Sequence, residues 1–197
     1  MKSAVISRSE RRQIQHAYER ALLLMNDPAA NPLQPHQLLV ECIIRDPATP
    51  IYIEALLANL AHRTSRSSQG WFSRIRNRKF LRSPVNDVSP ETLRRGLAIL
   101  YRDPANVSIL CHLAEIWMAS GLFITAECYL NQALSIQPGS VRAIPLLARS
   151  LVQQARFEEA LACWQKVPAT CIDDARISQV IDYLHSQLPA PGTNPME

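Results

Sequence analysis

The residues of this sequence best suited to chemistry form a cationic and aromatic cluster. Residues 63–82 contain seven Lys and Arg side chains together with Trp71, Phe72 and Phe80, and no acidic residue. Arg side chains bind carboxylates and phosphates through charge-assisted hydrogen bonds, and neighbouring aromatic rings can stack on bases. The candidate site for an anionic partner therefore comprises Arg66, Trp71, Arg74, Arg76, Arg78, Lys79 and Arg82.

Four interpretations of this cluster stay open. Its apolar residues keep neither the helical nor the strand period, so we expect a loop. Such a loop is either an insertion that its aromatic residues pin to the scaffold, or a surface for an acidic protein, a nucleic acid or an anionic membrane. The chain carries a net charge of +4, so these seven cations leave −3 for the remainder, and we expect no supporting basic surface elsewhere.

Other reactive residue types lack the spacing that catalysis or metal binding requires. The five Cys residues include no C-x-x-C pair, the five His residues never stand four apart, and five Gly residues provide no phosphate-binding loop. Asp173 and Asp174 open an apolar run, which favours helix capping over acid–base work. We therefore expect no enzyme activity, no metal and no cofactor.

An internal repeat indicates how the chain is built. "RDPATPIYIEALLANL" (45–60) aligns with "RDPANVSILCHLAEIW" (102–117), and a further unit begins 34 residues after the second. Each unit spaces its apolar residues for one helical face. The matching sets are Ile53, Leu56, Leu57 and Leu60; Leu110, Leu113, Ala114 and Trp117; and Ile144, Leu147, Ala148 and Leu151.

This pattern resembles the tetratricopeptide repeat (TPR) family, whose unit is a pair of antiparallel helices. Residues 107–140 carry the motif with Trp117, Gly121, Ala126 and Pro138, whereas residues 141–174 match less fully because Ile172 replaces the closing Pro. The whole chain is similar to uncharacterised bacterial TPR-containing proteins. The resemblance implies an all-α, right-handed helical solenoid of about four helix pairs with a C-terminal capping helix.

The resemblance also implies a domain organisation. The two "RDPA" segments lie 57 residues apart instead of 34, which leaves 23 additional residues between the helix at 50–62 and its expected partner at about 90–102. We expect N-terminal atypical TPR-like helices (1–62), the basic insertion (63–88), the second helix of an interrupted repeat (89–106), two TPR units (107–140 and 141–174), a capping helix (175–188) and a disordered tail (189–197).

Proteins of this family are typically non-enzymatic and hold a partner's peptide or helix in a concave groove. Carried onto this sequence, the groove residues are Cys111, Glu115, Met118, Arg142 and Arg149, flanked by Ser108 and Val152. Members that clamp the carboxylate of heat-shock chaperones use Lys and Asn, which this groove lacks. The resemblance thus implies a protein-interaction adaptor, and binding of nucleic acid or another anionic surface through residues 63–82 is the alternative.

The compartment follows from what the sequence does not contain. The N-terminus "MKSAVISRSERRQ" has no apolar run of signal-peptide length, and no window reaches the roughly 18 apolar residues of a membrane-spanning helix. We therefore expect a cytoplasmic protein with reduced, mostly buried thiols.

Overall fold

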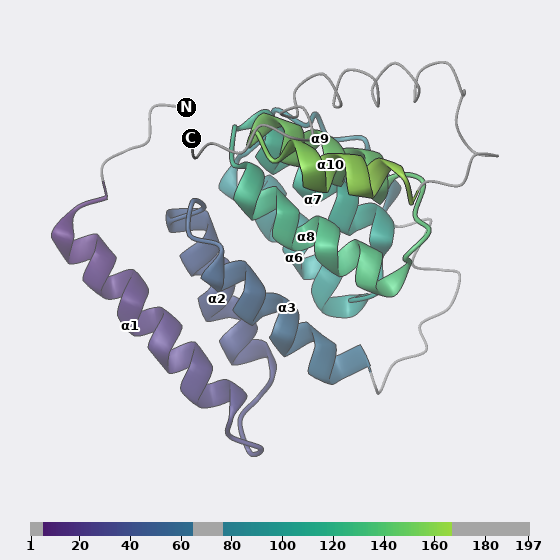
Figure 1. Cartoon of the computed structure of the whole chain (residues 1–197). Helices are drawn as coiled ribbons and strands as arrows, with labels where there is room; N and C mark the ends of the chain where they lie inside the picture. Colours follow the sequence, from purple (N-terminus) through teal and green to yellow (C-terminus); the bar gives the residue numbers. More distant parts are fainter. Residues whose placement is uncertain (1–5, 65–76, 167–197) are drawn as a thin grey trace, which may run out of the picture.

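The structure is a computed structural model that describes residues 6–64 and 77–166, with the side chains of residues 62–64 and 78 excepted. The described residues are helical and contain no strand, which confirms the all-α prediction for this part of the chain. In chain order the helices are α1 (Arg8–Met25), α2 (Leu33–Arg45), α3 (Ile51–Thr64), α5 (Arg78–Leu81), α6 (Pro90–Arg102), α7 (Val107–Ala119), α8 (Phe123–Ile136), α9 (Ala143–Gln153) and α10 (Phe157–Trp164) (Figure 1). The expected capping helix and tail lie outside the described residues.

Side-chain caps begin several helices at the positions expected from sequence. Ser7 and Glu10 form a reciprocal capping box on α1, with donor–acceptor distances of 2.9 and 3.2 Å. The Asn106 side chain accepts from the backbone N–H of Ile109 at 3.1 Å and so caps α7. Pro145 lies in the first turn of α9, where its missing N–H breaks no intrahelical hydrogen bond.

Three connections between helices share one backbone geometry. The residues that end α2, α6 and α8 are Asp46, Asp103 and Gln137, with φ/ψ of −139/74°, −137/77° and −135/87°. In the two "RDPA" segments the Asp carboxylate also accepts a side-chain hydrogen bond at 2.8 Å, from Thr49 and from Asn106 respectively. The repeated sequence therefore encodes a repeated turn.

The two hairpins at the C-terminal end repeat each other at a spacing of 34 residues. Gly121 and Ala155 take positive φ angles of 77° and 57° in the turns α7–α8 and α9–α10. In each turn the backbone N–H of the next residue bonds a carbonyl five residues earlier, from Leu122 to Trp117 at 2.9 Å and from Arg156 to Leu151 at 3.0 Å. The sequence repeat is thus also a repeat of backbone structure.

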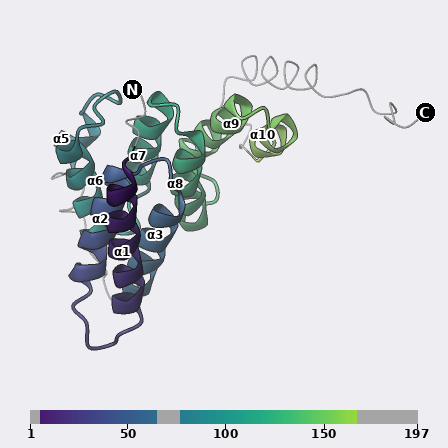
Figure 2. The same ribbon diagram turned by 90° about the vertical axis from the view of Figure 1, so that its left-hand side faces the viewer.

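Helices α3 and α6 occupy the middle of the molecule. Helix α3 packs against α1, α2 and α8, whereas α6 packs against α2, α5 and α7. This differs from the expected pairing of 50–62 with 90–102, because α2 lies against both helices and each then meets a different member of the α7–α8 hairpin. Figure 2 shows α1, α2, α3 and α6 grouped on one side and α9–α10 at the far end.

Polar contacts join the successive layers. Thr125, at the start of α8, donates to the carbonyl of Pro47 in the α2–α3 turn at 2.8 Å. At the other end Glu127 accepts from Arg156 at 2.7 Å and from Gln154 at 3.2 Å, which ties α8 to the α9–α10 turn. Among the helices that the structure describes, none combines the length and the apolarity needed to cross a bilayer.

Candidate partner-binding surface

The groove positions predicted on α7 are largely covered. Cys111 is fully buried and Met118 is 8% exposed, so both belong to the hydrophobic core rather than to a contact surface. Burial raises the pKa of the Cys111 thiol to about 11, partly opposed by the nearby cation Arg142. The equivalent residues of α9, 34 positions later, are the half-buried Pro145 and Val152. The face is therefore more open on α9 than on α7.

Glu115 and Arg142 are brought together from the predicted groove set. Arg142 Nη2 donates to Glu115 Oε2 at 2.8 Å, with side-chain exposures of 44% and 22%. Burial acts to raise the pKa of Glu115, but hydrogen bonds from His112 and Arg142 outweigh burial and lower the pKa below its ordinary value. These two charges stabilise each other, and Arg142 remains partly exposed to a partner.

Arg149 is the member of the predicted set most available to a partner. It is exposed on α9, and the described residues offer it no hydrogen bond or ion pair. Helix α9 itself contains no acidic residue. Because Glu115 and Arg149 hold equivalent positions in the two hairpins, and because α7 packs against α9, the repeat places these charges on neighbouring helices.

A hydrogen-bond chain connects this face to the basic insertion. Ser83 Oγ lies 3.1 Å from His112 Nε2, and His112 Nδ1 lies 3.3 Å from Glu115 Oε2. The order serine–imidazole–carboxylate is that of a hydrolase triad, but the Ser83 hydroxyl donates its hydrogen to the Phe80 carbonyl at 2.6 Å and His112 is 3% exposed. Without an activated hydroxyl or access for a substrate, the chain fixes residues 80–83 in place.

Phe80 anchors the C-terminal end of the insertion. Its ring is 1% exposed and meets His112 edge to face, with ring centroids 5.0 Å apart and planes at 89°. Residues 78–81 form the short helix α5, where the sequence pattern predicts no regular element. Burial of Phe80 against α6 and α7 explains the difference, since a tertiary contact fixes a segment that has no period of its own.

The structure describes only part of the predicted cationic cluster. Lys79 and Arg82 are exposed beside the Phe80 anchor. Arg78 begins α5, although its side chain lies outside the described residues. The remaining members, Arg66, Trp71, Arg74 and Arg76, also lie outside them.

Ser83 and His112 are the contributors that sequence reasoning missed. They stand 29 residues apart in separate helical contexts, and no local pattern links them. Within the described ranges no group of three or more His, Cys, Asp or Glu residues is arranged to hold a metal ion.

Comparison with known proteins yields no relative: no family model, no curated protein and no solved structure matches the chain.

Proposed function

We propose that this protein is a non-enzymatic interaction scaffold of the TPR kind, in which a right-handed solenoid holds a peptide or helix of a partner protein. The partner lies on the face formed by α7 and α9. Glu115, Arg142 and Arg149 supply its polar contacts, and the half-buried Pro145 and Val152 supply apolar ones. Cys111 and Met118 support this face from the core without touching the partner.

The observation that carries this proposal is the repetition of hairpin geometry at 34 residues. Two hairpins with the same turn and the same packing present equivalent positions side by side, which makes an extended surface from a small unit. Such a surface suits an extended or helical segment better than a small molecule.

The charge of the face indicates the chemistry of the partner. Arg142 and Arg149 lie seven residues apart on α9, about 10 Å along the helix axis. Both guanidinium groups are accessible, and one of them already binds a carboxylate, that of Glu115. A partner segment with acidic side chains on either side of an apolar residue would complement this arrangement.

Affinity capture from nuclease-treated lysate tests the proposal with four full-length proteins. These are the wild type, Arg149→Glu, Arg142→Glu combined with Arg149→Glu, and a matched control with Arg8→Glu and Arg20→Glu on the exposed surface of α1. We expect a protein that the wild type and the control capture equally, that Arg149→Glu captures less, and that the double groove variant loses. Arg149→Glu matters because it breaks no described ion pair, so its effect cannot come from loss of the Glu115–Arg142 contact. Capture that both groove variants leave unchanged contradicts the proposal.

A further inference from the structure

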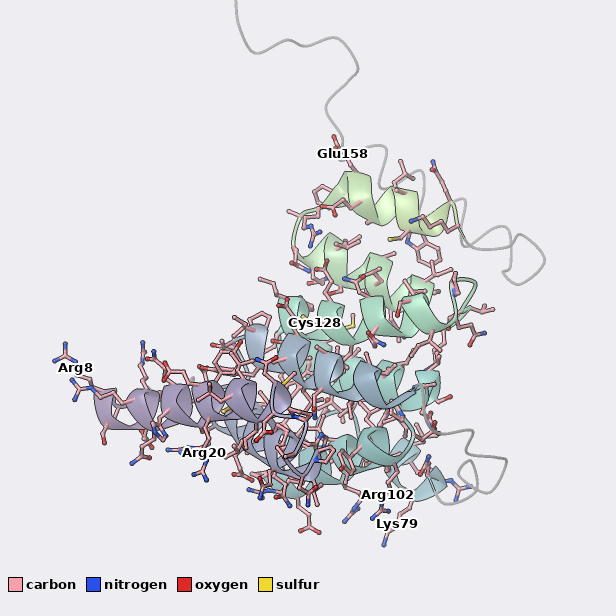
Figure 3. The ribbon with its side chains drawn as sticks, turned by 90° about the horizontal axis from the view of Figure 1, so that it is seen from below. Arg8, Arg20, Lys79, Arg102, Cys128 and Glu158 are labelled. Atoms are coloured by element: carbon pink, nitrogen blue, oxygen red, sulfur yellow. The ribbon has the colours of Figure 1, made fainter. Side chains whose placement is uncertain are left out.

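A basic surface lies on the outer side of α6, where the total charge of the chain gives no hint of it. Arg94, Arg95 and Arg102 are exposed along this helix, and Arg94 and Arg102 are about 12 Å apart along its axis. Helix α5 packs against α6, and Figure 3 shows Lys79 of α5 beside Arg102 (Figure 3). The fold thus adds three Arg residues to the anchored end of the cationic insertion.

The acidic residues near this surface are fewer and already engaged. Glu41 accepts from Arg94 Nε at 3.1 Å and from Arg94 Nη2 at 3.0 Å, and Glu91 pairs with Arg95 at 3.1 Å. Both ion pairs are exposed, so each contributes little stability and can be exchanged for another anion. Arg102 and Lys79 form no ion pair with the described residues and are free to bind an anion.

A groove between α2 and α6 adjoins these cations. It has a volume of about 550 Å³ and an apolar floor that includes Val40 and Ala98. The rings of His36 and Tyr101 lie on its wall with centroids 4.6 Å apart and planes at 45°. Arg94 and Arg102 also line the groove, so guanidinium groups lie near an apolar, aromatic recess.

This combination favours one class of anion over the others. An acidic peptide needs cations, but it has no particular need for an aromatic wall. A membrane surface needs exposed aromatic residues rather than a recess. Single-stranded nucleic acid presents a flat base flanked by phosphates, and it gains affinity from base stacking on aromatic rings and from phosphate contacts with Arg and Lys. The recess lies within the size range of small-ligand sites.

We propose that the α2/α6 groove binds single-stranded nucleic acid. A base enters the groove against Tyr101, and Arg94, Arg102 and Lys79 contact the neighbouring phosphates. The site uses none of the residues of the α7/α9 face, so it stands or falls independently of the protein-binding proposal.

Fluorescence anisotropy with labelled oligo(dT) and oligo(rU) and the full chain tests this site. We compare the wild type, Lys79→Glu with Arg102→Glu, and the matched control Arg8→Glu with Arg20→Glu, each checked for native helicity by circular dichroism. We expect the site pair to weaken binding at least tenfold and to lower the slope of log Kd against log salt by about two, because each lost phosphate contact removes about one unit. The control should bind within a factor of about two of the wild type, since its charges lie away from the site.

Substitutions at Tyr101 separate base stacking from bare electrostatics. Tyr101→Phe retains the ring and should bind as the wild type does, whereas Tyr101→Leu should lose about tenfold without a change in salt slope. Three outcomes each overturn the proposal: binding that the site pair leaves unchanged, equal losses in the site pair and the control, or competition by polyglutamate as effective as competition by unlabelled oligonucleotide. The last result would assign the surface to an acidic protein instead.

Discussion

Phe80 packs its ring against the backbone of Gly96 so closely that a Cβ atom at position 96 would lie 2.5 Å from Phe80 Cζ. The same atom would lie 2.9 Å from Leu113 Cδ2 on α7. Gly96 is therefore the notch in α6 through which the end of the insertion reaches the core. The contact explains a glycine in the interior of a helix, where it costs about 1 kcal/mol relative to Ala.

Gly96→Ala should destabilise the protein despite the better helix propensity of Ala. Overpacking costs about 1–3 kcal/mol in a well-packed core, and the propensity gain of about 1 kcal/mol offsets part of it. Urea unfolding measures the difference. Gly139→Ala is the control, because a Cβ there meets no atom within 4 Å. Adding Phe80→Leu to Gly96→Ala should recover part of the loss; equal stability of all four proteins would show that the notch does not constrain position 96.

Trp117→Ala should be among the most destabilising single changes. Trp117 is 2% exposed on α7 and belongs to the continuous core, so its removal leaves a large cavity and costs about 3–5 kcal/mol. Ile124→Ala on α8 is the control, since that side chain is 60% exposed and should lose well under 1 kcal/mol. A loss below about 1 kcal/mol for Trp117→Ala, measured by chemical denaturation, would contradict the packing described for α7.

Local features of this fold could be predicted from the sequence, because short stretches of chain determine them. The Ser7–Glu10 capping box, the Asn106 cap and the repeated "RDPA" turn each depend on residues within a few positions of one another. The 34-residue spacing likewise predicts the matching turns at Gly121 and Ala155. In each case the interaction is encoded where it occurs.

Long-range features could not be predicted in the same way. The contact of Phe80 with Gly96 and the chain from Ser83 through His112 depend on how the insertion returns to the scaffold. The basic face of α6 was missed for a related reason, since a net charge of −3 outside residues 63–82 conceals how Arg side chains and carboxylates are distributed in space. Cys111 shows the converse case, in which a position expected in a groove is covered by packing.

Thr125→Val should uncouple the α2–α3 turn from α8. The Thr125 hydroxyl is buried and donates to the Pro47 carbonyl at 2.8 Å, so Val preserves the shape but leaves that carbonyl without its donor, at a cost of about 1–3 kcal/mol. Ser135→Ala removes a hydroxyl bond of the same 2.8 Å length to the carbonyl of Gln132 at an exposed site, where water replaces it. Thermal unfolding should show a clear loss for Thr125→Val and almost none for Ser135→Ala. Equal effects would mean that the interhelical bond adds nothing beyond a local one.

The buried thiols should make stability fall at alkaline pH. Burial raises the pKa values of Cys42, Cys111 and Cys128 to about 11 from an ordinary value of 9.0. A folded-state pKa above the unfolded value favours the folded protein fully below pH 9 and progressively less as the pH rises toward 11, because the unfolded chain releases its protons first. Urea midpoints measured across this range should therefore decline, and Cys111→Ala should decline less steeply than the wild type.

Thiol labelling at about pH 8 gives an independent check, because only the thiolate reacts with disulfide reagents. We expect Cys42 and Cys111, both essentially unexposed, to label at the rate of unfolding and to react rapidly once urea is added. Cys128 is half-buried, so it should label faster than these two despite a similarly raised pKa. Rapid native-state labelling of Cys111 would return that residue to the surface of the α7/α9 face and restore it to the candidate partner contacts.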